Sequence, residues 1–268
     1  MLEVLMTNWK IGVIGFGNIA QALIGGLLKV DAISSDQVYV CSAHYDKCCA
    51  NAERMSVHPC RTAEEVIEQS DLVILAVKPY QMEKVCVPIQ KLLKEKIVVT
   101  VASKWNFDRF DEVLVSGTHH ISMIPNTPVA VAEGIVIIEE KNSLSEDELN
   151  QWKALLNQIA LVEMVDSDHM SIADTISGCT PAFTAMYLEA LGDAGVKHGL
   201  TRAMAYRLVA QMLKGTGSLY LEQGKHPGAM KDAVCSPNGT TIRGVEALEK
   251  NGFRAAAMEA INAAMNKK

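Results

Sequence analysis

The sequence predicts an α/β protein in which a mainly parallel sheet is followed by an all-helical C-terminal domain. Three observations lead to this fold class. Short runs of apolar and β-branched residues alternate with helix-length segments through the first half of the chain. A glycine-rich turn follows the first of these runs. From Ser167 onward the strand pattern stops, and only helical segments follow.

Each apolar run in the first half has the length and composition of a buried strand. The predicted strands cover Lys10–Ile14, Gln37–Cys41, Asp71–Val77, Ile97–Val101, His119–Met123, Ile135–Ile138 and Leu161–Val165. The segments between them, such as Asn18–Val30 and Tyr45–Met55, are long enough for crossover helices. Strands separated by helices form βαβ units, in which the strands run parallel.

The second part of the chain has a helical pattern throughout. Helices are predicted over Asp168–Ile176, Pro181–His198, Arg202–Glu222, Thr240–Asn251 and Phe253–Met265, with breaks at Gly178, Gly199 and Gly224–Gly228. We place the domain boundary near Asp166, so that residues 1–166 form the sheet domain and 167–268 the helical domain. The segment Ala182–Ala194 carries little polar surface, which predicts either deep burial in its own domain or a place in a subunit interface. Because the whole helical part is so apolar, we expect a homo-oligomer.

Composition excludes several classes of protein. The chain has 268 residues, 49% of them hydrophobic, which is enough for a sizeable core. Its net charge of −6, without a Lys/Arg block, argues against binding nucleic acid or anionic membrane. No apolar run is long enough to span a bilayer, and the acidic start does not look like an export signal. Seven cysteines without a C-x-x-C pair predict reduced thiols in a cytoplasmic protein and no metal site.

The turn after the first strand predicts a dinucleotide site. Gly15-x-Gly17-x-x-Ala20 follows a strand and opens a helix, which suits the close approach of a pyrophosphate to a helix N-terminus. Glycine-rich turns after strands are common, so the position of this one inside a βαβ unit strengthens the prediction. The predicted cofactor-binding residues here are Ile14, Gly15, Phe16, Gly17, Asn18 and Ile19.

Other strand ends should complete this site. An NAD-specific site usually has Asp or Glu after the second strand, whereas this chain has Ser42 and His44 there, which favours NADPH although Asp46 keeps NADH open. Ligands of parallel sheets bind beyond the carboxyl ends of the strands, although a surface lysine before a proline is equally ordinary. We therefore predict contacts from Ala76, Val77, Lys78, Pro79, Ala102, Pro125 and Asn126, with the Asn126 amide facing nicotinamide or substrate.

The segment Val234–Thr241 predicts a small anion site. Its Pro and Gly form a turn that feeds a helix, and free backbone N–H groups of Gly239, Thr240 and Thr241 would face a carboxylate. Ser236 and the two threonines add hydroxyls, although ordinary N-capping would use the same residues. No acid–base pair is evident, and hydride transfer to a protonated imine requires none.

In these motifs the chain resembles the pyrroline-5-carboxylate reductase family over essentially its whole length. The matching pieces are Gly15-x-Gly17, Ala76-Val77-Lys78-Pro79, Pro125-Asn126-Thr127-Pro128, Gly178-x-x-Pro181-Ala182, Gly199-Leu200, His226-Pro227, Ser236-Pro237-x-Gly239-Thr240-Thr241, Leu248-Glu249 and Gly252-Phe253-Arg254. The resemblance implies a Rossmann-type domain, a helical dimerisation domain, often a ring of dimers (a decamer), and NAD(P)H-dependent reduction of 1-pyrroline-5-carboxylate to L-proline.

The resemblance also implies residue roles. Val234, Ser236, Gly239, Thr240 and Thr241 would bind the substrate, and Thr241 and Ser236 would be the catalytic residues, with Thr241 at the ring nitrogen. The chain departs from the family pattern at Ser103-Lys104, Ser122, Thr180 and Asn238. Two other interpretations therefore stay open: a dinucleotide-binding regulatory protein without turnover, and a 2-keto or 3-hydroxy acid dehydrogenase that uses Lys197 or Lys214.

Overall fold

The computed structural model describes residues 7–266, and the chain divides into two compact units, Met1–Gly178 and Cys179–Lys268. This division falls later than the boundary predicted near Asp166. The reason is that α7 (Met170–Asp174) contacts strand β7 and so belongs to the sheet unit. Each unit is described by itself below.

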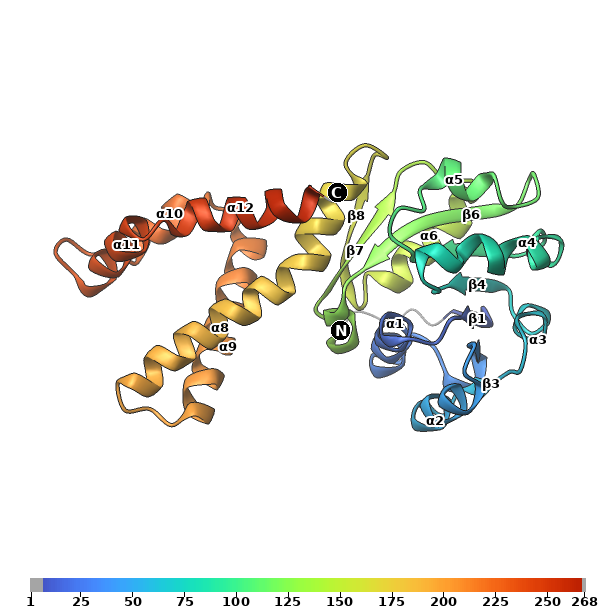
Figure 1. The fold of residues 1–268 in the computed structure, drawn as a ribbon, viewed down its shortest axis with the longest axis horizontal. Helices are drawn as coiled ribbons and strands as arrows, with labels where there is room; N and C mark the ends of the chain where they lie inside the picture. The colour runs from blue at the N-terminus through green and yellow to red at the C-terminus, as the bar shows by residue number, and fades with distance from the viewer. Residues whose placement is uncertain (1–6, 267–268) are drawn as a thin grey trace. The chain divides into compact units, whose positions relative to one another are not determined.

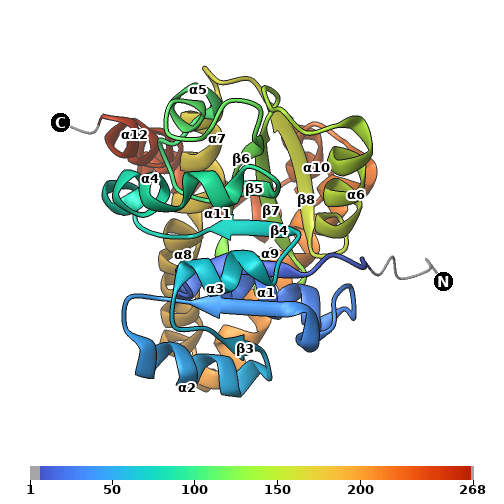
Figure 2. The ribbon, with the colours of Figure 1, turned by 90° about the vertical axis from the view of Figure 1, so that its right-hand side faces the viewer.

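The first unit is built on one eight-stranded sheet with the order β3-β2-β1-β4-β5-β6-β7-β8 (Figures 1 and 2). Its strands are β1 Ile11–Ile14, β2 Val38–Cys41, β3 His58–Pro59, β4 Leu72–Leu75, β5 Ile97–Thr100, β6 His119–Pro125, β7 Gly134–Glu139 and β8 Ala160–Val165. All neighbouring pairs are parallel except β6 and β7. The mainly parallel sheet is thus confirmed, and only the two-residue strand β3 lacked a signal in the sequence.

Helices cover both faces of this sheet. The helices of the first unit are α1 Asn18–Lys29, α2 Tyr45–Met55, α3 Ala63–Glu68, α4 Met82–Leu93, α5 Phe107–Asp111, α6 Glu146–Leu156 and α7. One apolar core joins α1, α2 and α6 to the sheet, and a second core joins α3, α4 and α5 to the other face. Successive strand residues therefore alternate between two cores, as Ile74 and Leu75 of β4 do.

The second unit consists of helices. They are α8 Thr180–Lys197, α9 Arg202–Gln223, α10 Pro227–Ala233, α11 Thr240–Lys250 and α12 Phe253–Met265. No strand follows Ser167 within the described residues, which confirms the predicted change of pattern. Helix α10 was not predicted and begins inside the predicted break Gly224–Gly228, because Pro227 starts a helix readily and His226 caps it by accepting from the N–H of Gly228.

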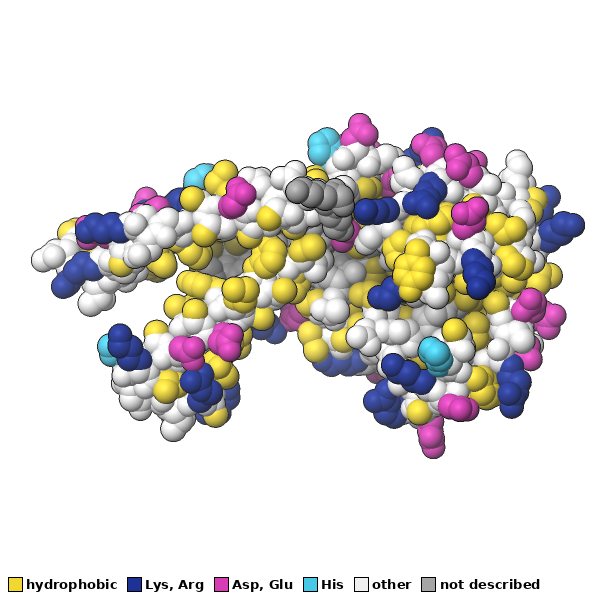
Figure 3. All heavy atoms as spheres, viewed as in Figure 1, with side chains coloured by type: hydrophobic (Ala, Val, Ile, Leu, Met, Phe, Trp, Pro, Cys, Tyr) yellow, Lys and Arg dark blue, Asp and Glu magenta, His cyan; other side chains and the backbone are white. Residues whose placement is uncertain are grey.

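The predicted break at Gly178 is instead a π-helical segment, Thr175–Cys179, between α7 and α8. Within residues 179–266, only Gly192 and Ala205 are buried. Many large apolar side chains of these helices stay exposed, and Figure 3 shows hydrophobic atoms along α8 and α12. No described helix is both long enough and apolar enough to cross a membrane.

Candidate dinucleotide and substrate sites

The turn between β1 and α1 has the geometry of a phosphate-binding loop. Gly15 has φ +98°, and a Cβ there would lie 2.7 Å from the carbonyl carbon and oxygen of Ala76. Only glycine fits such a close approach at a positive φ. Gly17 is not in such a close contact, because a Cβ there would meet no protein atom within 4 Å. The turn is therefore tight against β4 on one side and open on the other.

Helix α1 begins at this open side without a capping side chain. Gly17 is its N-cap residue, and no side-chain hydrogen bond caps the helix start. The first backbone N–H groups of α1 are therefore available to an anion, which the helix dipole also attracts. The Gln21 side chain donates to the Phe16 carbonyl at 3.0 Å and holds the turn, while Ala20 packs into the core. These features fit the pyrophosphate of a dinucleotide.

The ends of β1, β2, β4 and β5 are level with one another. Ile14 pairs with Cys41 on one side and Leu75 on the other, and Leu75 pairs with Thr100. The predicted cofactor residues after these strands therefore lie along one carboxyl edge, where ligands of open parallel sheets bind. The register of the sheet therefore places the predicted cofactor-binding residues between Ile14 and Ala102 along the same edge.

The end of β2 offers neutral and basic groups. Ser42 is half-buried and His44 is exposed, and the Ser42 hydroxyl donates to the His44 carbonyl at a long 3.4 Å. Burial raises the pKa of the adjacent Cys41 thiol to about 12, so this side chain carries no charge at neutral pH. No carboxylate occupies the position directly after β2, which is consistent with the predicted use of NADPH.

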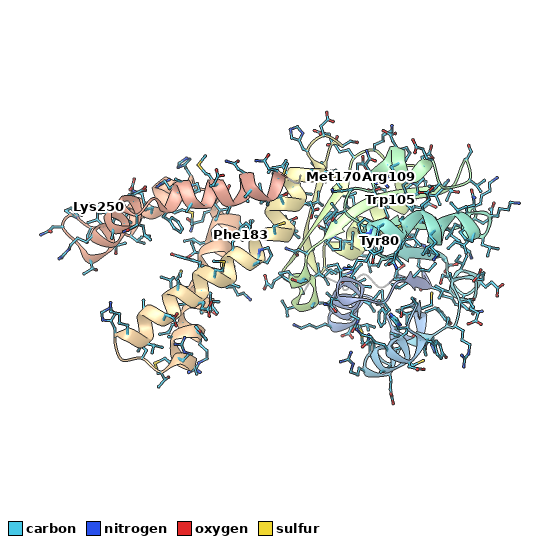
Figure 4. All side chains as sticks on the ribbon, viewed as in Figure 1. Tyr80, Trp105, Arg109, Met170, Phe183 and Lys250 are labelled. Atoms are coloured by element: carbon cyan, nitrogen blue, oxygen red, sulfur yellow. The ribbon has the colours of Figure 1, made fainter. Side chains whose placement is uncertain are left out.

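The loops after β4 and β5 are joined by an indole hydrogen bond that the sequence did not reveal. The Trp105 indole Nε1 donates to the Pro79 carbonyl at 2.9 Å, and the Arg109 guanidinium lies 4.3 Å from the centre of the Trp105 ring. Figure 4 labels both side chains, together with Tyr80, which is 83% exposed. Lys104 has φ +68°, a conformation that glycine adopts more easily.

The Asn126 side chain makes two hydrogen bonds within the chain that the sequence did not predict. It is buried, its Oδ1 accepts from the N–H of Ile135 at 2.8 Å, and its Nδ2 donates to the Ser177 carbonyl at 3.0 Å. The amide therefore connects β7 to the π-helical segment, and both its oxygen and its nitrogen are engaged within the chain. The two prolines predicted a rigid loop, but single-sequence reasoning could not identify partners so distant in sequence.

The turn before α11 has an open helix start, but one backbone N–H that was expected to be free is already bonded. Gly239 is the N-cap residue, with no side-chain cap, so the N–H groups of Thr240 and Thr241 begin the helix. The Gly239 N–H was expected to be free, but it donates to the Ser236 carbonyl at 3.0 Å. It is used to close the turn, since a four-residue turn pairs its first carbonyl with its last N–H.

Two further contacts shape this turn. A Cβ on Gly239 would lie 2.4 Å from Ser236 Oγ, so glycine is needed to place that hydroxyl at the helix start. Asn238 has φ +56°, a left-handed conformation that asparagine tolerates better than most residues. Val234 lies four residues further back and is 65% exposed.

Arg243 is a neighbour that the motif did not predict. Its Nε donates to the Gly239 carbonyl and its Nη2 to the Asn238 carbonyl, both at 3.2 Å. The guanidinium therefore braces the turn and adds positive charge beside the two free N–H groups. The signal was present in the sequence, since an Arg four residues after the N-cap can reach back over one helical turn.

The histidine pair in β6 is structural. His119 Nδ1 lies 2.7 Å from Glu148, whereas the buried His120 ring stacks on Phe107 at 4.4 Å and contacts Asp111 at 3.1 Å. No group of three or more His, Cys, Asp or Glu side chains suited to a metal ion occurs in the described part of the chain.

Family models match both parts of the chain. Residues 167–268 match the model described as pyrroline-5-carboxylate reductase dimerisation. Residues 10–104 match the model described as NADP oxidoreductase, coenzyme F420-dependent. The second match covers the glycine turn and the first five strands, so both findings agree with the geometry of their segments.

Curated and solved relatives cover nearly the entire chain. The pyrroline-5-carboxylate reductase of Treponema pallidum is 39% identical over 96% of this chain and 99% of its own length. That of Escherichia coli is 35% identical over 96% of both chains. The crystal structure of Plasmodium falciparum pyrroline carboxylate reductase with NADP bound has a TM-score of 0.87 and 28% identity, covering 97% of each chain.

Proposed function

Because the chain belongs to the pyrroline-5-carboxylate reductase family, we propose that it reduces 1-pyrroline-5-carboxylate to L-proline with NADPH. The observation that carries this proposal is that one chain has a candidate site for each of the two reactants, the coenzyme and the substrate. An open glycine turn lies at the carboxyl edge of a parallel sheet, and an uncapped, hydroxyl-rich turn begins α11. NADH is the weaker alternative coenzyme, because no carboxylate directly follows β2.

In this proposal the turn before α11 binds the substrate. The N–H groups of Thr240 and Thr241, with the Ser236 hydroxyl, hold the carboxylate, and the α11 dipole favours its charge. The Thr241 hydroxyl contacts the ring nitrogen and orients the imine. NADPH supplies the hydride for the imine carbon, and the nitrogen keeps the proton that it carries. Gly239 and Val234 complete this site.

The cofactor residues follow from the sheet edge. Backbone groups of residues 14–19 bind the pyrophosphate, and Ser42 and His44 face the adenosine ribose. Ala76, Val77, Lys78, Pro79, Ala102 and the backbone of Pro125 and Asn126 line the nicotinamide half. This arrangement is supported by the level strand ends and by the open space at Gly17.

We extend the proposal to assembly and location. The dimerisation match and the exposed apolar helices of the second unit support a homodimer, and a decamer built as a ring of dimers is the larger assembly proposed. All seven cysteines are free, which is usual for reduced thiols in the cytoplasm. Residues 167–268 are proposed as the dimerisation domain.

The test of this function is a direct assay. Purified protein is mixed with pyrroline-5-carboxylate and either NADPH or NADH, and the loss of nicotinamide absorbance is followed. Turnover that is faster with NADPH is expected, with L-proline as the product. Measurable coenzyme binding without any turnover would overturn the proposal and favour a regulatory protein. Turnover with a 2-keto acid alone would favour a dehydrogenase.

Thr241→Val tests the assignment of the substrate turn. Valine keeps the shape of threonine but removes the hydroxyl, so kcat should fall by about 100-fold, as for the loss of one catalytic hydrogen bond. The NADPH dissociation constant, measured by fluorescence titration, should change less than about twofold, a difference of under 0.5 kcal/mol. Loss of NADPH binding in this variant would contradict the role given to Thr241.

A further inference from the structure

The carboxyl edge of the sheet continues past β2 to a strand that was not predicted. β3 pairs with β2 in parallel, with Val40 opposite Pro59, and the Cys60 N–H donates to the Val40 carbonyl at 2.8 Å. Two residues beyond this pair, the same register brings Arg61 level with Ser42. Adjacent strands lie about 4.8 Å apart, so Arg61 belongs to the edge that carries the adenosine ribose.

Arg61 is held over an aromatic ring from the neighbouring helix. Its guanidinium carbon lies 4.4 Å from the centre of the Tyr45 ring, and Tyr45 is the first residue of α2. Figure 2 shows β3 and α2 together at the lower end of this unit. A guanidinium stacked on a ring keeps its in-plane N–H donors free to bind an anion.

The backbone at Arg61 is fixed by the start of α3. Its N–H donates to Glu65 Oε2 at 2.7 Å, and Thr62 accepts from the Glu65 N–H at 3.2 Å. This capping arrangement ties the Glu65 carboxylate to backbone. Among residues 7–266, the guanidinium of Arg61 makes no ion pair within 4.0 Å.

We propose that Arg61, stacked on Tyr45, binds the 2′-phosphate of NADPH and is the main determinant of the preference for NADPH over NADH. The proposal rests on the proposed use of NADPH and adds a residue outside the motif that predicted the cofactor site. Arginine binds phosphate bidentately, and the Tyr45 ring presets the orientation of the guanidinium. Ser42 and His44 add hydrogen bonds from β2, while Asp46 in the first turn of α2 opposes the anion.

The test measures coenzyme binding without turnover. Fluorescence titration gives dissociation constants for NADPH and NADH, and calorimetry gives that of 2′,5′-ADP, which carries the phosphate without the nicotinamide. Arg61→Gln should weaken NADPH and 2′,5′-ADP at least about tenfold, as expected for a lost charge-assisted hydrogen bond, and should leave NADH within about twofold. Tyr45→Phe should keep the affinities because it keeps the ring, whereas Tyr45→Ala should weaken both phosphate-bearing ligands.

Arg54→Gln is the matched control. Arg54 lies in the last turn of α2, at the opposite end from Tyr45, and it bonds to the Asn51 side chain. Arg54→Gln removes the same charge as Arg61→Gln. Because Arg54 lies away from the proposed phosphate site, the affinity for NADPH should not change. An equal loss in both Arg variants would indicate general electrostatics and overturn the proposal.

Other results separate this proposal from the proposed function. An Arg61→Gln variant that keeps the wild-type ratio of NADPH to NADH affinity would overturn the role of Arg61, even if the enzyme still turns over pyrroline-5-carboxylate. A wild-type protein that binds neither coenzyme would overturn both. An equal loss of NADPH and NADH affinity in Arg61→Gln would also contradict the proposal, because NADH has no 2′-phosphate.

Discussion

At the scale of single residues, the two glycines of the first turn serve different purposes. A Cβ at residue 15 would collide with the Ala76 backbone at a positive φ, whereas one at residue 17 would enter open space. Gly15→Ala should therefore lower the free energy of unfolding by about 1–3 kcal/mol and also abolish NADPH binding. Urea denaturation and fluorescence titration would measure the two effects.

Gly17→Ala is the paired variant. Its free energy of unfolding should fall by no more than about 1 kcal/mol, because alanine is a weaker N-cap than glycine but meets no clash and no backbone strain at φ −86°. Its affinity for NADPH should fall at least about tenfold, since the added methyl occupies the space proposed for the pyrophosphate. A Gly17→Ala protein that is unstable, or that binds NADPH normally, would contradict this division of roles.

A buried histidine makes stability depend on pH. The His120 ring is fully buried, and burial lowers its pKa against the opposing effects of Asp111 and Glu139. The unfolded chain has the ordinary value of about 6.5, so below that pH it binds more protons than the folded chain. The contribution of His120 to the free energy of unfolding is therefore fully present above about pH 6.5. It is lost as the pH falls towards the lower pKa of the folded state.

His120→Phe should remove this dependence. Phenylalanine can keep the stack on Phe107, and it eliminates the Nδ1 atom that is buried without a partner. The free energy of unfolding, measured by urea denaturation from about pH 8 to about pH 5, should fall less steeply in the variant than in the wild type. Parallel curves for the two proteins would show that His120 does not titrate as described.

At the scale of elements, the turn before α11 depends on the left-handed conformation of Asn238. Asn238→Gly should leave activity and stability nearly unchanged, because glycine adopts φ +56° without strain. Asn238→Val should cost about 1–2 kcal/mol in that conformation and displace Ser236 from the helix start. The KM for pyrroline-5-carboxylate should then rise while NADPH affinity stays constant. An unchanged KM in Asn238→Val would separate the turn from substrate binding.

Periodicity and turn chemistry predicted most elements, because they are local properties. Buried runs such as Leu72–Leu75 identify their strands by composition alone. By contrast, β3 is two residues long and exists because β2 offers it an edge. The side chain of Asn126 could not be assigned either, since its partner Ser177 lies 51 residues away in the sequence. Motif spacing thus predicted the candidate sites, and tertiary contacts decided which atoms remain free there.

At the scale of the whole molecule, the change from strands to helices was visible in the sequence, while two measures place the division at different residues. The family match begins at residue 167, whereas compactness places the division after Gly178. The two measures differ because α7 and the π-helical segment contact the sheet unit through β7 and Asn126. A boundary read from pattern cannot include such contacts.

We predict that the second unit needs a partner surface to be stable, since residues 167–268 match a dimerisation family model. Between residues 179 and 266 only Gly192 and Ala205 are buried, whereas Met186 is 70% exposed and Leu221 is 68% exposed. Exposed apolar area of this kind marks an interface. Met186→Glu and Leu221→Glu should therefore convert the oligomer to monomers in sedimentation velocity runs and lower the unfolding midpoint. Val87→Glu, at a 45% exposed apolar position of α4 in the first unit, is the control that should leave the assembly intact. If the wild-type midpoint does not depend on protein concentration and both α8 and α9 variants remain oligomeric, the interface must lie elsewhere.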